Sequence, residues 1–147
     1  MRLFALSAIA ALSACTPVTS AEQPAATVDA PTGLNASDIA GEWRVAGVNG
    51  GEVNQSNGIT ASITDKTILI NSGCVNMVYS YTLSNGTFSA ALGQDVGGKP
   101  VMSCMRGLSD TENAIGDAIQ KADTAKKDAS NALVLSGGGT SLSLYTQ

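Results

Sequence analysis

The chain has 147 residues, of which 44% are apolar and 14% are charged, and its formal net charge is −4. This length allows one domain with its own core, and the lack of a basic stripe argues against nucleic acid as a partner. The sequence contains no histidine, which excludes a histidine-based catalytic triad and leaves too few ligands for a zinc site.

Residues 1–14 have the pattern of a signal peptide. Met1 and Arg2 provide a short positive start, and residues 3–14 form an uncharged run rich in Leu and Ala. This run has the length of a signal-peptide core and is too short to span a bilayer as a mature helix. Cleavage after residue 14 removes Arg2 and leaves seven basic and twelve acidic side chains, a net charge of −5.

Cys15 follows this leader and is the odd one of the three cysteines. The segment Leu12-Ser13-Ala14-Cys15 resembles the bacterial lipobox, and the alternative is an ordinary signal peptide with a chance cysteine. The resemblance implies cleavage before Cys15 and acylation of its sulfur, and two or more acyl chains hold a protein stably at a bilayer. The residue after Cys15 is Thr16 rather than Asp. In a cell with two membranes, the resemblance then implies sorting to the outer membrane, with the domain facing the periplasm.

Residues 15–38 are predicted to form the lipidated N-terminus and a flexible tether. Three of the four prolines lie here among Ala, Ser and Thr, and no apolar period of 2 or 3.6 runs through the stretch. Such a composition buries too little apolar surface to offset the entropy of ordering. The tether would hold a folded domain, residues 39–147, clear of the lipid surface.

The folded part is predicted to be a mostly antiparallel sheet of about seven or eight short strands. Asn-Gly and Gly-Gly pairs, which suit tight turns, recur between short segments of alternating polarity. In residues 75–83 every second side chain is apolar or aromatic, which predicts one buried face. The other strands are expected at residues 43–48, 59–63 and 67–70, around Phe88, and at residues 132–135 and 141–145.

Residues 110–125 are predicted to form the one helix of this domain. Ser109 and Glu112 make a capping box, and Gly116 weakens the helix by up to about 1 kcal/mol relative to Ala. Lysines gather toward its expected C-terminal end, where positive charge is favourable. The apolar stripe consists of Ala114, Ile115, Ala118, Ile119 and Ala122.

The order of these features resembles a known family. The features are Gly41-x-Trp43, Asn49-Gly50, Gly73-Cys74 with Tyr81 seven residues after the cysteine, Met102-x-Cys104, a capped helix with Glu112, and Leu142-Ser143-Leu144. Together they resemble the META domain, or HslJ-like, family of envelope proteins and lipoproteins. The resemblance implies an α+β fold, a partly open antiparallel β-barrel closed by one helix. It also implies roles in envelope stress or antibiotic tolerance, with no established catalytic residues.

Cys74 and Cys104 remain once Cys15 is acylated. In an oxidising compartment an even pair favours a disulfide, and two buried thiols are the alternative. Closing a loop of about 30 residues would stabilise the fold by roughly 3–4 kcal/mol in the chain-entropy description.

Four aromatic side chains, Trp43, Tyr79, Tyr81 and Phe88, either fill the core or line a ligand cavity. We expect a lipid-anchored, non-enzymatic interaction or stress-response module whose partner is an envelope protein, with no cofactor and no metal. One alternative is a periplasmic carrier that holds a lipid or another apolar molecule inside the barrel. The other is an enzyme that uses a constellation of carboxylates or serines.

Overall fold

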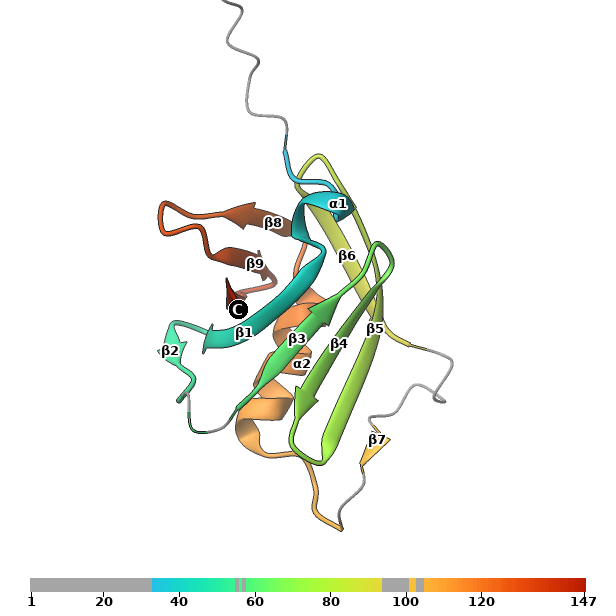
Figure 1. Cartoon of the computed structure of the whole chain (residues 1–147), viewed down its shortest axis with the longest axis vertical. Coiled ribbons are helices and arrows are strands. Elements are labelled where there is room, and N and C mark those ends of the chain that lie inside the picture. Colours follow the sequence, from blue (N-terminus) through green and yellow to red (C-terminus); the bar gives the residue numbers. More distant parts are fainter. Residues whose placement is uncertain (1–32, 55, 57, 94–100, 103–104) are drawn as a thin grey trace, which may run out of the picture.

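The structure is a computed structural model, and it describes residues 33–54, 56, 58–93, 101–102 and 105–147. The predicted leader, Cys15, most of the tether and Cys104 lie outside these residues. Figure 1 shows a strongly curved sheet with one long helix on its concave side.

Eight antiparallel strands form a closed ring. β10 pairs with β1, so the last strand of the chain meets the first and the expected α+β barrel is confirmed as a closed one. Two short strands lie outside the ring: β2 (Gly51–Glu52) pairs with β1, and β7 (Val101–Met102) pairs with β5. In spatial order the ring consists of β1 (Gly41–Val48), β3 (Thr60–Ile63), β4 (Thr67–Ser72), β5 (Val75–Ser84), β6 (Thr87–Leu92), β8 (Thr124–Lys127), β9 (Leu133–Gly137) and β10 (Thr140–Thr146).

Strict alternation along the strands decides which side chains enter the barrel. In β5 the predicted inner face is confirmed, because its five members are between 0% and 7% exposed. A slip of one residue would turn this whole set outward. The five are Val75, Met77, Tyr79, Tyr81 and Leu83.

Two of the predicted Asn-Gly turns have the backbone that this dipeptide favours. Asn49 and Gly50 have φ values of 53° and 77°, and Asn85 and Gly86 have 50° and 80°. Positive φ at both central residues matches the right-handed twist of the flanking strands. These turns therefore fix the register of the β1–β2 and β5–β6 hairpins.

The helix α2 (Asp110–Lys121) packs against β6, β9 and β10. Its predicted capping box is present: the Glu112 amide donates to Ser109 Oγ at 3.2 Å, and the Ser109 amide donates to Glu112 Oε2 at 2.7 Å. Ile115 and Ile119 are fully buried. The helix thus packs against the inner side of the ring at β6, whose pairing with β8 is limited to Thr87 and Thr124.

The predicted C-terminal end of this helix is wrong by four residues. α2 ends at Lys121, Ala122 has extended backbone, and residues 124–127 form β8. The Asp123 amide donates to the Ser136 carbonyl at 3.0 Å, and Thr124 pairs with the same residue. A strand is favoured here because it bonds to β6 and β9 at once, whereas a longer helix would leave the ring open.

Residues 33–38, which the sequence analysis assigns to the tether, contact the barrel. Leu34 packs against the core, and α1 (Ala36–Ile39) ends in Ile39, which is fully buried. The Gly33 amide donates to Asn85 Oδ1 at 2.8 Å. A Cβ at Gly33 would lie 2.4 Å from the carbonyl carbon of Asn85, so only glycine allows this approach.

The β9–β10 hairpin lies against the end of α2 at Gly137, which yields a stability prediction. A Cβ at Gly137 would lie 2.5 Å from both the Asp123 amide nitrogen and the Lys121 carbonyl oxygen. Because both atoms are backbone, we expect Gly137→Ala to lower the free energy of unfolding by about 2–3 kcal/mol in urea denaturation.

Gly139 is the matched control for this substitution. A Cβ there meets nothing within 4 Å, and its φ of +77° predicts a loss of about 1 kcal/mol from the left-handed backbone alone. Equal losses for Gly137→Ala and Gly139→Ala would contradict the close approach.

Candidate functional site

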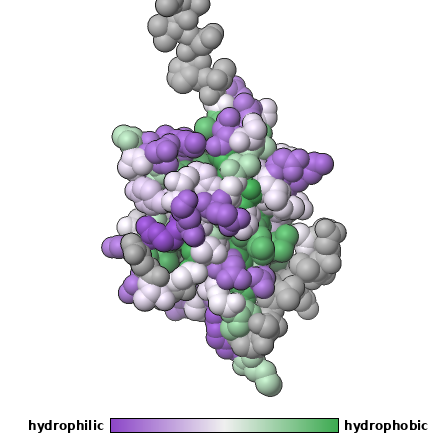
Figure 2. Space-filling model, in the orientation of Figure 1, coloured by the Kyte–Doolittle hydropathy of each residue, from purple (hydrophilic) through white to green (hydrophobic). Residues whose placement is uncertain are grey.

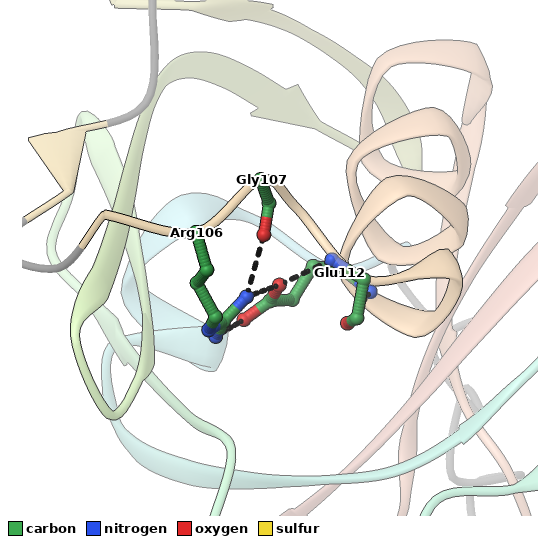
Figure 3. A network of polar contacts seen from close by, with 4 residues as sticks. Arg106, Gly107 and Glu112 are labelled. Atoms are coloured by element: carbon green, nitrogen blue, oxygen red, sulfur yellow. Dashed lines mark hydrogen bonds and ion pairs between the residues drawn. The ribbon is translucent and has the colours of Figure 1, made fainter.

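The carboxylate of Glu112, on the first turn of α2, is buried and paired. Glu112 is 1% exposed, and Figure 3 shows the guanidinium of Arg106 facing it. Arg106 Nη2 donates to Oε1 at 2.6 Å, and Nη1 donates to Oε2 at 2.7 Å. Nη1 also donates to the Gly107 carbonyl at 2.9 Å. This two-pronged, charge-assisted arrangement ties the loop before α2 to the helix.

Three donors keep Glu112 ionised. The guanidinium of Arg106, the Ser109 amide and the Ser72 hydroxyl hold the pKa of this carboxyl well below its usual range, although burial acts in the opposite direction. A group with so low a pKa does not exchange protons near neutral pH, so Glu112 is unsuited to general acid–base catalysis. Its role is to join the loop, the helix and the end of β4.

A cavity of about 430 Å³ lies beside this pair, between the β4–β5 turn and the start of α2. Both Nη groups of Arg106 are bonded to the Glu112 carboxylate, so the positive and negative charges in the wall of the cavity cancel. The cavity therefore lacks the excess positive charge that an anion site requires. Its lining residues are Ile59, Ser72, Gly73, Cys74, Arg106, Ser109, Thr111 and Glu112.

A second, smaller cavity of about 160 Å³ lies between β5 and α2. The Tyr79 hydroxyl borders it, 3.5 Å from Met77 Sδ. Burial and the nearby Asp117 raise the pKa of Tyr79 to about 12, so the phenol stays neutral. A Cβ at Gly116 would lie 3.0 Å from that hydroxyl, which explains a glycine inside the helix.

The four aromatic residues singled out in the sequence lie in the core. Trp43, Tyr79, Tyr81 and Phe88 are between 1% and 6% exposed. Trp43 Nε1 donates to the Ile39 carbonyl at 2.8 Å, and the Tyr81 and Phe88 rings stack with centroids 5.7 Å apart. Of the four, Tyr79 alone lines one of the two cavities described above.

The predicted cysteine roles fall largely outside the described residues. Cys15 and Cys104 lie outside them, so lipidation and the Cys74–Cys104 disulfide stay predictions. Cys74 lies in the β4–β5 turn, is engaged in an interaction and lines the larger cavity.

Arg106 is the site residue that the sequence analysis missed. Glu112 was predicted only as a capping residue, and its buried ion pair was not predicted. The available signal was weak: Arg106 is one of three arginines in the chain and lies shortly before a capped helix.

Neither a metal site nor a membrane-spanning helix is found in the part of the chain that the structure describes. No three His, Cys, Asp or Glu side chains there are grouped so that they could hold a metal ion. No helix there has the length and apolar character needed to cross a bilayer.

The family model of the META domain matches residues 37–147. This range begins in α1 and includes the whole barrel and α2. The comparisons with curated proteins and with solved structures found no match.

The buried pair predicts a stability loss when Arg106 is replaced. Arg106→Met would leave a buried carboxylate with amide and hydroxyl donors only, and we expect the free energy of unfolding at pH 7 to fall by about 1–3 kcal/mol. This value is below the usual cost of breaking a buried pair because the Arg106 side chain is 44% exposed. Lys121→Met, which breaks the exposed pair with Asp117, is the control and should cost at most about 0.5 kcal/mol.

The same pair predicts a defined pH dependence. Because the folded state lowers the pKa of Glu112, its contribution is complete above the ordinary value of 4.5 and declines as the pH falls below it. The stability difference between wild type and Arg106→Met should therefore narrow below pH 4.5 in denaturation curves. A difference that stays constant down to the acid transition would contradict the assignment.

Proposed function

Since the chain belongs to the META domain family, we propose that it is a lipid-anchored protein of the bacterial cell envelope whose barrel is a non-enzymatic interaction or stress-response module. The segment Leu12-Ser13-Ala14-Cys15 supports the anchor, which would be acyl chains on Cys15. Thr16 supports an outer-membrane position with the domain facing the periplasm.

The observation that supports this role is the filled interior of the barrel, which leaves little room for a ligand inside. Tyr79, Ile68 and Leu142 are among the large side chains that are fully buried there. The cavity between β5 and α2, about 160 Å³, is smaller than the roughly 300–1,000 Å³ typical of ligand sites. The larger cavity, about 430 Å³, has the Arg106–Glu112 ion pair in its wall, which does not suit an apolar molecule. This favours recognition on the outer face over carriage of an apolar molecule inside, so the carrier alternative has less support.

The outer face suits a module that works in water beside a membrane. Figure 2 shows mostly hydrophilic and neutral residues on the visible face, with apolar residues in smaller patches. Eighteen residue steps separate Cys15 from Gly33, which allows a reach of up to about 60 Å. The mature chain has a net charge of −5, so anionic lipids would repel it.

Metabolic labelling with an alkyne analogue of palmitate tests the anchor. In a bacterium with two membranes, the wild-type chain should carry the label and sediment with the outer membrane. Cys15→Ala should lose the label, because no thiol remains at the cleavage position.

Ser13→Ala is the matched control, since it keeps a small residue in the lipobox and should label as the wild type does. An unlabelled wild-type chain, or a Cys15→Ala variant that stays membrane-bound to the same extent, would refute the proposal.

A further inference from the structure

An open trough of about 270 Å³ lies on the outer face of the barrel, where β1, β2 and β10 meet. Its floor is formed by small residues of β1 and β10, and Tyr145 and Glu52 are its two large side chains. Neither Arg106 nor Glu112 contributes to it. Its lining residues are Ala46, Gly47, Gly50, Gly51, Glu52, Ser141, Ser143 and Tyr145.

A β-bulge and a tight turn build this trough from backbone. The β1–β10 register moves from Val45–Leu144 to Gly47–Ser143, which adds one residue in β1. Bulges bend and twist a strand, and they are enriched beside functional sites. A Cβ at Gly47 would lie 3.2 Å from the Gly51 carbonyl oxygen, so glycine lets β2 fold close to β1.

The turn is also fixed to β10. Asn49 Oδ1 accepts a hydrogen bond from the Ser141 amide at 3.0 Å, and the Asn49 amide donates to the Ser141 carbonyl at 2.8 Å. Hydrogen bonds therefore attach the turn at Asn49, which forms one wall of the trough, to β10.

Tyr145 is an exposed aromatic side chain that is held in place. Its hydroxyl lies 3.0 Å from Ser130 Oγ, which donates to Asp128 Oδ1 at 2.7 Å. The guanidinium carbon of Arg44 lies 6.0 Å from the ring centroid. Tyr145 is 36% exposed, and its side chain is contacted at the hydroxyl and on one face of the ring. Little side-chain entropy is therefore lost when a ligand stacks on it.

Polar groups face the trough with hydrogen-bonding capacity left. Ser141, Ser143 and Tyr145 share the outer face of β10, since the alternating Leu142 and Leu144 are fully buried. Among the described residues, no side-chain hydrogen bond or ion pair engages the Ser143 hydroxyl or the Glu52 carboxylate. These are acceptors and donors suited to the hydroxyls of a ligand.

We propose that this trough binds one ring of a neutral pyranose glycan. The face of the Tyr145 ring carries negative charge density that attracts the weakly positive C–H face of a sugar. The Ser143 hydroxyl and the Glu52 carboxylate would take hydrogen bonds from sugar hydroxyls. The volume fits a single ring, and the open ends let a longer chain continue.

The charges favour a neutral sugar over an acidic one. Glu52 would repel a carboxylate or phosphate, and the nearby cation, Arg44, already lies over Tyr145. This inference rests on the proposed role as an interaction module and names the class of its partner. It does not depend on the lipid anchor.

Saturation-transfer difference NMR tests the site with the full chain in phosphocholine detergent. The probes are the β-1,4-linked tetramers of N-acetylglucosamine and of glucose. We expect saturable binding, with the strongest transfer to the C–H protons of one ring face. Tyr145→Ala should weaken affinity at least tenfold because the stacking surface is lost, and Glu52→Gln should weaken it several-fold.

Tyr145→Phe keeps the ring and should retain most of the affinity, which separates stacking from loss of fold. Thr82→Ala, on the outer face of β5, is a control that should bind as the wild type does. The site is refuted if neither tetramer gives a saturable signal up to about 10 mM, or if Tyr145→Ala binds as tightly as wild type. Palmitate labelling without sugar binding would overturn this inference alone, and sugar binding without labelling would overturn the anchor alone.

Discussion

The pairing of β1 with β10 is the contact on which the rest of the structure depends. It joins the two ends of the folded chain, with Trp43 opposite Thr146 at one end of the seam and Val48 opposite Leu142 at the other. Closure removes the free strand edges that would invite pairing with another chain. It also fixes the curvature of the sheet around α2, and the interior is occupied by the protein's own side chains.

The β1–β10 seam and the start of α2 have different structural effects. The bulge in the seam, at Ala46, opens the trough beside Tyr145, whereas the Arg106–Glu112 pair fixes where the helix begins. A buried ion pair adds little net stability relative to apolar residues of the same size, and its main effect here is to set position. The bulge fixes the position of β2 beside β1, and the ion pair fixes the position of the loop before α2.

Local signals in the sequence were sufficient for most of the barrel and insufficient at its joints. Alternation identified the inner face of β5, and the Ser109–Glu112 capping box identified the start of α2, because each depends on neighbours in sequence. The end of α2 depends on a hydrogen bond between Asp123 and Ser136, and the attachment of residues 33–38 to the barrel depends on a contact between Gly33 and Asn85. Such long-range contacts leave no periodic trace, and β2 and β7 are too short to show one.

Native-state hydrogen exchange is the most direct test of the closed ring. The Val45 amide bonds to the Ile59 carbonyl on the β3 side, so by alternation the amides of Arg44 and Tyr145, which lie opposite each other, face the seam. If β1–β10 closure holds the fold together, these two seam amides exchange only through global unfolding, with a free energy of opening equal to that from denaturation. The amides of the β4–β5 pair should give the same value. Seam amides that open with a much smaller free energy than those of β4–β5 would show an open sheet and contradict the account.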